Sequence, residues 1–387
     1  MARAAKRKKA KKAAPVKARA KKSTKKLTKK LTKTGSKTAA KAIAPAAGPV
    51  TLDEAKALAR AKQPKLALQA VRKTAAPPAS PAAVGAEREK LEKQRRDERA
   101  RRVREYKATM EIMKRRGARR PRPKAVKAED GEPTAKGGGS FAPLQIFAEG
   151  DSWFDYPPFI LHGGIVSRLE DRLGVPILNL AEAGDEVRFM LGVKERAILN
   201  EHLTNGCPAG GPWDVLLFSG GGNDIVDNPM ALWVKDWNPA MPPASHIQQP
   251  RFDAALALVR AGYEDLIELR DKLSPTTHLV FQAYDFAIPD GRGICGFGPW
   301  LQPTFDLRKF PTLAAGQAVV KAMLQQFAAL LTSLTVHPKV TFINGQGTLA
   351  PQPNSWHNEL HPTQAGFEKF ADVFHLNLKA LFPDRVA

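Results

Sequence analysis

Short apolar runs alternate with longer amphipathic stretches from residue 141 to the end of the chain. The runs have the length of buried strands, whereas the longer stretches repeat apolar residues with the helical period. The pattern predicts strands at 144–148, 176–181, 214–219, 277–283 and 339–343. It predicts helices at 160–173, 186–202, 252–273, 312–334 and 363–381. Such alternation indicates right-handed βαβ crossovers and a buried parallel sheet with helices on both faces.

The region before residue 141 has a different composition. Residues 1–140 contain 43 Lys and Arg against 12 Asp and Glu, a balance of +31. Residues 141–387 contain 18 and 26, a balance of −8, so the net charge of +23 averages two unlike parts. The chain is a cationic arm joined to a mildly acidic body.

Two helices are expected within the arm. Thr51 to Glu54 has the form of a capping box and opens a short helix. Residues 87–116 form a longer one, with i,i+4 pairs such as Glu98 and Arg102 in the favourable order. Its second half carries one narrow apolar stripe, which we expect to dock on the body or on a partner chain. The members of the stripe are Val103, Tyr106, Met110 and Met113.

These features divide the chain into four parts. Residues 1–50 hold 18 Lys and Arg and no acidic residue, which favours a disordered basic tail. Residues 51–116 are the helical charged region, and 117–140, rich in Pro, Lys and Gly, are a flexible linker. Residues 141–387 are the folded domain.

Polar residues of chemical interest follow the predicted strands. Ser152, in a Gly-Asp-Ser corner, follows the first strand, and Gly184 follows the second. Asn223, in a Gly-Gly-Gly-Asn-Asp run, follows the third, and His361 lies after the fifth. Active sites of parallel α/β sheets lie at the carboxyl ends of the strands. We therefore expect these residues to meet.

Together they have the residue types that acyl transfer requires, namely a nucleophile, a base and donors for the oxyanion. Ser152 is the candidate nucleophile and His361 the candidate base, because histidine titrates near neutral pH. The backbone N–H groups of Ser152 and Gly184 and the side-chain amide of Asn223 are the candidate oxyanion donors.

At these positions the chain resembles the SGNH or GDSL hydrolases. The resemblance rests on four blocks in family order: Gly150-Asp151-Ser152, Gly184, Gly221-Gly222-Asn223-Asp224 and His361-Pro362. It covers roughly residues 144–381. It implies a three-layer α/β/α fold with a flavodoxin-like, parallel, five-stranded sheet. It also implies hydrolysis of carboxylic esters of small molecules, lipids or carbohydrates, without metal or cofactor.

One position departs from the family pattern. The family places an aspartate three residues before the histidine, where this chain has Asn358. Three outcomes are open: Asn358 orients His361, or Glu359 or a distant carboxylate such as Asp155 takes over, or the site is slow or inactive. An amide oxygen can fix the tautomer of an imidazole but brings no full charge to the imidazolium.

Three functions remain compatible with the sequence. The first is a serine esterase that the basic arm localises to a polyanion. The second is a polyanion-binding or nucleic-acid-binding protein with a weak or inactive hydrolase-like body, and the third is an acyltransferase with the same site. The tail would bind phosphate backbones without sequence specificity, through counterion release, and an anionic membrane or granule surface would satisfy the same charge.

The remaining features concern location and the pocket. Cys207 and Cys295 give neither a disulfide framework nor metal-ligand spacing. The first thirty residues have no apolar core of a signal peptide, and no apolar run approaches about 18 residues, so we expect a cytoplasmic protein without a transmembrane segment. Trp233, Trp237 and Trp300 either line a substrate pocket or pack loops onto the body.

Overall fold

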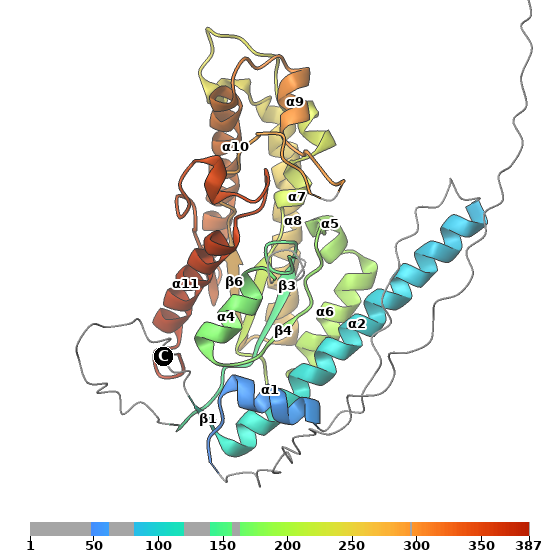
Figure 1. The fold of residues 1–387 in the computed structure, drawn as a ribbon, viewed down its shortest axis with the longest axis vertical. Helices are drawn as coiled ribbons and strands as arrows, with labels where there is room; N and C mark the ends of the chain where they lie inside the picture. Colours follow the sequence, from blue (N-terminus) through green and yellow to red (C-terminus); the bar gives the residue numbers. More distant parts are fainter. Residues whose placement is uncertain (1–47, 62–80, 120–139, 157–162, 295, 387) are drawn as a thin grey trace, which may run out of the picture. The chain divides into compact units, whose positions relative to one another are not determined.

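The computed structural model describes residues 48–61, 81–119, 140–156, 163–294 and 296–386 (Figure 1). The predicted basic tail, apart from its last three residues, and most of the predicted linker lie outside the described residues, as does Cys295.

A five-stranded sheet forms the centre of the fold, and all its neighbouring strands are parallel. Its order is β4-β3-β5-β6-β7, the flavodoxin-like order. The predicted α/β fold class is thus confirmed. The first crossover places β4 on one side of β3, and the second places β5 on its other side. The direction of the crossovers therefore changes beside β3. The strands are β3 (Ile146–Gly150), β4 (Ile177–Asn179), β5 (Val215–Ser219), β6 (His278–Gln282) and β7 (Val340–Ile343).

Helices cover both faces of this sheet. On one face α4 (Ile165–Leu173) packs against α11 (Gln364–Leu381), and on the other α8 (Gln249–Leu273) contacts α6 (Val193–Asn205) and α10 (Leu313–Ser333) (Figure 1). The shorter helices are α1 (Leu52–Ala61), α5 (Val187–Met190), α7 (Gly222–Ile225), α9 (Gln302–Leu307), η1 (Asn228–Leu232), η2 (Pro243–His246), η3 (Leu334–Val336) and η4 (Pro353–Ser355).

Two predicted helices differ clearly from the observed ones. The helix predicted over 160–173 begins at Ile165 after Gly163, whose φ of +89° a helix cannot accommodate, and positions 160–162 lie outside the described residues. The helix predicted over 186–202 is two helices, because the backbone at Gly192 is extended between α5 and α6. The helices predicted to begin at 252 and 87 begin earlier, at Gln249 and Pro81.

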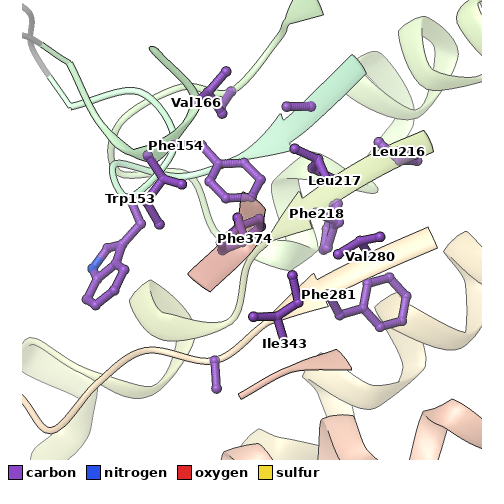
Figure 2. Close-up of a cluster of buried hydrophobic side chains, with 14 of the residues drawn as sticks. Trp153, Phe154, Val166, Leu216, Leu217, Phe218, Val280, Phe281, Ile343 and Phe374 are labelled. Carbon is purple, nitrogen blue, oxygen red and sulfur yellow. The ribbon is translucent and has the colours of Figure 1, made fainter. Parts of the chain in front are cut away.

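Apolar side chains alternate between the two faces of the sheet. Leu217 and Val280 lie on the face of α11, where Phe374 packs, as Figure 2 shows. Phe218 points to the opposite face, where its ring meets Tyr263 of α8 at 5.1 Å between centroids. Every residue of β3 and β5 is buried, as expected for a parallel sheet covered on both faces.

The long helix α2 (Pro81–Arg116) packs on this body and lies beside β4 and α1. Tyr106, Met110 and Met113 of its predicted stripe are at most 4% exposed. Tyr106 packs against Trp213, with the ring centroids 5.5 Å apart and the planes tilted by 43°, and its hydroxyl lies 3.6 Å from the sulfur of buried Cys207. A two-stranded antiparallel ribbon of β1 (Ala118–Arg119) and β2 (Ser140–Phe141) lies between α2 and the sheet in the sequence.

One helix among the described residues, Leu313–Val336, is long and apolar enough to cross a bilayer. Half of its apolar window is buried inside the protein. Its buried residues include Val319, Phe327 and Leu331, which belong to the common hydrophobic core. Length and composition of this kind are shared by core helices of α/β bodies.

Candidate active site

The nucleophile candidate lies on a tight turn directly after β3. The carbonyl of Asp151 accepts the N–H groups of Phe154 and Asp155, both at 3.0 Å, and its carboxylate accepts the N–H of Trp153 at 3.0 Å. Gly150 is required before this turn, because a Cβ there would lie 2.6 Å from the carbonyl oxygen of Ser219. The turn presents Ser152, 8% exposed, at the carboxyl end of the central strands.

His361 reaches the serine from the loop before α11. Its Nε2 lies 2.6 Å from Ser152 Oγ, across 209 residues of sequence. The rings of Tyr156 and Trp300 flank the imidazole, with centroids 4.5 and 6.0 Å away. Burial, followed by the nearby His357, lowers the pKa of His361 to about 3. The imidazole is therefore neutral at neutral pH and free to accept a proton at Nε2.

The structure places Asn358, and not Glu359, against the imidazole. Asn358 Oδ1 lies 2.9 Å from His361 Nδ1 and also accepts the backbone N–H groups of Leu360 and His361, at 3.0 and 2.9 Å. Its amide nitrogen donates to the Tyr156 hydroxyl at 3.3 Å. Because two backbone donors face Oδ1, the amide cannot rotate to present its NH₂ group. The arrangement holds the proton on Nδ1 and leaves Nε2 as the acceptor.

Glu359 has a different position and different contacts. Its carboxylate is fully buried and accepts four backbone N–H groups at 2.5–2.9 Å. The donors belong to Gly291, Trp300, Leu301 and Gln302. Glu359 thus fixes the loop beside the imidazole and faces away from His361 Nδ1. The third carboxylate considered, Asp155, pairs with Arg102 of α2 at 2.8 Å.

The three oxyanion candidates come from three strand ends. The backbone N–H groups of Ser152 and Gly184 donate to no acceptor within the part of the chain that the structure describes. Gly184 has a φ of +91°, which favours glycine, and open space lies around the position of a Cβ. Asn223 donates one amide hydrogen to the carbonyl of Asp185 at 2.8 Å, which leaves its second hydrogen for a ligand and ties α7 to the Gly184 loop.

Carboxylates behind the site hold it together. Asp151 Oδ2 accepts the Tyr284 hydroxyl at 2.5 Å, and Oδ1 accepts the Ser219 hydroxyl at 3.1 Å. Burial raises the pKa of Asp151 to about 6. Asp224 accepts the N–H of Val187 at 2.9 Å, which joins α7 to α5. These contacts support the loops and leave proton transfer to the serine–histidine pair.

A narrow cavity of about 40 Å³ opens beside the nucleophile. Ser152, His361 and Asn223 form its polar end. Most of the remaining lining is apolar, although Asp151 and Asp285 also border the cavity. Apolar side chains from α7, the segment after it, and α10 contribute Ile225, Val226, Met230, Val320, Met323 and Leu324. Such a shape suits a short acyl group, whose carbonyl carbon would lie at the serine.

The tryptophans divide between the two interpretations open from sequence. Trp233 packs on Phe252, and Trp237 stacks on the ring of His246 at 5.0 Å, so both pack loops. Trp300 lies near the imidazole. Sequence reasoning did not single out Tyr156 or Tyr284, whose hydroxyls contact Asn358 and Asp151; no spacing in the sequence indicates these contacts.

Among the described residues, no group of three or more His, Cys, Asp or Glu side chains could hold a metal ion. The groups that the site brings together are a hydrogen-bonded serine, a neutral imidazole and fixed hydrogen-bond donors.

Comparisons with known proteins give similarity only at the level of the fold. No family model and no curated protein sequence matches the chain. Among solved structures, a lipase from a goat rumen metagenome is 16% identical, with a TM-score of 0.40 over 60% of this chain and 96% of that one. An extracellular lipase from Streptomyces rimosus is 17% identical, with a TM-score of 0.39 over 60% and 99%.

A third similar structure is Est24, a carbohydrate acetylesterase from Sinorhizobium meliloti, at 13% identity and a TM-score of 0.39 over 62% of this chain and 100% of that one. Further matches are described as GDSL-like lipases and an SGNH hydrolase. These descriptions name the family that the four sequence blocks resemble. At this identity and these TM-scores, the likeness gives no information on substrate.

Proposed function

We propose that the chain is a serine hydrolase that cleaves carboxylic esters through an acyl-serine intermediate. The observation that carries the proposal is the 2.6 Å contact between Ser152 Oγ and His361 Nε2. The backbone N–H groups of Ser152 and Gly184, which follow the neighbouring strands β3 and β4, have no partner in the described chain. A hydroxyl, a neutral imidazole and unused donors are the parts that acyl transfer requires.

In the first step His361 Nε2 takes the proton of Ser152 Oγ while the oxygen attacks the ester carbonyl. The carbonyl oxygen becomes negatively charged in this step. It accepts hydrogen bonds from the N–H groups of Ser152 and Gly184 and from the free amide hydrogen of Asn223. Collapse of the tetrahedral intermediate breaks the bond to the alcohol, and the alkoxide leaves with the proton from Nε2. Water then repeats the sequence on the acyl-serine, which frees the acid and restores the serine.

Asn358 supports this cycle by orientation without charge. It accepts the Nδ1 proton, so that Nε2 faces the serine. Its neutral amide does not attract the imidazolium that forms in the transition state. The low pKa of His361 likewise makes the imidazolium unfavourable. We therefore expect turnover at a modest rate that persists into acidic solution.

A fluorophosphonate probe and nitrophenyl acetate test the proposal. The wild-type protein should be labelled at Ser152 and hydrolyse the ester, and Ser152→Ala should lose both properties by at least about 10³-fold. Ser333→Ala is the matched control, because Ser333 ends α10 and its hydroxyl donates to the carbonyl of Leu330 and accepts from Arg260, with no contact to the site. Folded Ser152→Ala with undiminished turnover would show that the nucleophile is another residue. Absence of labelling in folded wild-type protein would favour a polyanion-binding protein with an inactive body.

Two extensions belong to the same proposal. The basic tail, with 18 Lys and Arg and no acidic residue in residues 1–50, would hold the enzyme on a polyanion such as nucleic acid. An acceptor alcohol in place of water would make the same site an acyltransferase. Product analysis with and without added alcohols distinguishes the two, since only a transferase yields a new ester in preference to the free acid.

A further inference from the structure

The face of α2 that is turned to the body carries three arginines near the active-site loops. Arg95, Arg99 and Arg102 follow one another at helical spacing, so they share one side of the helix. All three make ion pairs with carboxylates of the body, and α2 runs beside β4 and α6 (Figure 1). A helix that precedes the folded domain in sequence thus reaches the loops that follow β3 and β4.

Arg102 contacts both of these loops with one guanidinium group. Its Nη1 donates to the carbonyls of Asn179 and Ala181, at 3.1 and 3.3 Å, at the end of β4. Its Nη2 donates to the Asp155 carboxylate at 2.8 Å, on the turn that presents Ser152. Since a guanidinium group is planar and rigid, these bonds fix the distance between the two segments.

The neighbouring arginines hold the same loop one residue further along. Arg99 and Arg95 contact the two carboxylate oxygens of Glu182, at 3.2 and 3.1 Å. The N–H of Glu182 in turn donates to the carbonyl of Gly150 at 2.9 Å. Residues 179–182 are therefore held from the α2 side just before Gly184, whose N–H is the candidate oxyanion donor.

We propose that Arg102 is a positioning residue of the hydrolase: it sets the separation between the Ser152 turn and the Gly184 loop, which makes α2 part of the catalytic unit. This inference rests on the proposed function, because it assigns Gly184 the role of an oxyanion donor. Arg102 touches neither substrate nor serine and acts through the backbone that it holds. Misplacement of a catalytic donor by about 1 Å is enough to lower a rate by about 100-fold.

Arg102→Gln tests the inference, and Arg101→Gln is its matched control. Arg101 has the same charge on the same helix but pairs only with Glu98 and Glu105 of α2 itself. With nitrophenyl acetate, Arg102→Gln should lower kcat by about 10- to 100-fold with little change in KM, and Arg101→Gln should stay within about twofold of wild type. Equal melting temperatures of the two variants establish that the loss is not general unfolding.

Chemical rescue separates positioning from a merely structural effect. A groove of about 330 Å³ between α2 and the loop, lined by Arg95, Arg99 and Asp155 among others, gives free guanidinium access to the vacated position in Arg102→Ala. Millimolar guanidinium, far below denaturing concentrations, should restore part of kcat in Arg102→Ala and have no effect on Arg101→Ala. Wild-type kcat in Arg102→Gln, or a loss in Arg102→Ala that guanidinium does not restore, would overturn the inference.

A second variant keeps the test decisive where Arg102→Gln fails to fold. Asp155→Asn weakens the other end of the bridge and should lower kcat with little change in KM. Where Arg102→Gln does fold, the two losses should not add in the double variant. Additive losses, or an unchanged Asp155→Asn, would contradict the inference. Failure of the proposed function gives a different result, because then either the folded wild type is inactive or Ser152→Ala remains active, whatever happens at Arg102.

Discussion

The two sides of Ser152, the proposed nucleophile, are held by opposite chemistry. On the histidine side, a buried carboxylate, Glu359, accepts four backbone N–H groups of the loop at residues 291–302. On the oxyanion side, a guanidinium group, Arg102, donates to backbone carbonyls and to Asp155. The difference lies in exposure and origin: Glu359 is 0% exposed and next in sequence to Asn358, whereas the Arg102 side chain is 25% exposed and comes from a separate helix.

This comparison indicates which side tolerates change. A buried carboxylate with four donors cannot lose its charge without leaving N–H groups unpaired in the core. A partly exposed arginine can be replaced while water satisfies some of the freed carbonyls. We therefore expect the histidine side to govern stability and the oxyanion side to govern rate.

The largest effect should follow from Glu359→Gln, which breaks the histidine side. The new NH₂ group would face two of the four donors, so the free energy of unfolding should fall by about 3 kcal/mol or more and turnover should fall with it. Urea unfolding and nitrophenyl acetate hydrolysis measure the two quantities. Glu368→Gln is the control, because Glu368 is a half-exposed partner of Arg168 and Arg172 and should cost about 1 kcal/mol or less. Comparable losses of unfolding free energy in Glu359→Gln and Glu368→Gln would contradict the expectation that the histidine side governs stability.

The next effect concerns a buried acid on the oxyanion side. Burial raises the pKa of Glu149, on β3, to about 8 from its usual 4.5. Between these values the folded protein keeps the proton that the unfolded chain releases, so stability should fall as pH rises through the window and level off above it. Glu149→Gln should remove this slope and be more stable than wild type by about 2 kcal/mol at pH 8.

Denaturant midpoints from pH 5 to 9 measure this difference. Glu264→Gln, a change on the exposed side of α8 where Glu264 pairs with Arg260, is the control and should keep the wild-type slope. An unchanged slope in Glu149→Gln would place the titration on another group, of which Asp185, with a pKa raised to about 7 by burial, is the nearest alternative.

A smaller effect, of about tenfold in rate, should follow from Asn358→Asp, which adds charge to the histidine side. A carboxylate at the orienting position would raise the pKa of His361 and stabilise the imidazolium in the transition state, so kcat should increase. In wild type, the depressed pKa keeps His361 neutral far below pH 6.5, and the acid limb of kcat/KM should lie correspondingly low. In Asn358→Asp the limb should move to higher pH.

The pH profile of kcat/KM between pH 3 and 9 checks this expectation. Asn238→Asp provides the control, because exposed Asn238 accepts the N–H of Ala240 in a loop turn and should leave the profile unchanged. An acid limb that stays in place in Asn358→Asp would mean that the aspartate is protonated or turned away from the imidazole.

The smallest effect on turnover should come from removal of residues 1–46. Residues 47–387 form one compact unit that contains both sides of the site, so ester hydrolysis should be unchanged. Salt-sensitive retention on immobilised DNA should be lost with the 18 cationic residues. Equal DNA retention by the shortened protein would shift polyanion binding to the helical region.

The sequence alone is informative where function depends on local spacing. The five strands and the places of Ser152, Gly184 and His361 follow from hydrophobic patterning and from short motifs at the strand ends, whereas the flavodoxin-like strand order is implied by the family resemblance. The contact between Asn358 and His361 is also local, since three residues separate them. The sequence left Asn358 and Glu359 as alternatives, because only the path of the loop decides which of two neighbours faces the imidazole.

Long-range contacts between side chains and backbone groups cannot be recognised from residue spacing in the sequence. The pairing of Arg102 with Glu98 has a signature in the i,i+4 spacing, but its bonds to the carbonyls of Asn179 and Ala181 have none, because any residue supplies a carbonyl. The same holds for the four N–H groups at Glu359. These contacts depend on how α2 and the loops pack, which the sequence pattern does not specify.

The position of Glu359 also has a consequence for the order of folding. Its four donors lie 57–68 residues earlier in the chain, so neither the loop at 291–302 nor the segment around His361 can complete its hydrogen bonds before the other arrives. The two segments should therefore open and close as one cooperative unit. Since His361 belongs to that unit, a local opening there would separate His361 from Ser152 while the sheet remains folded.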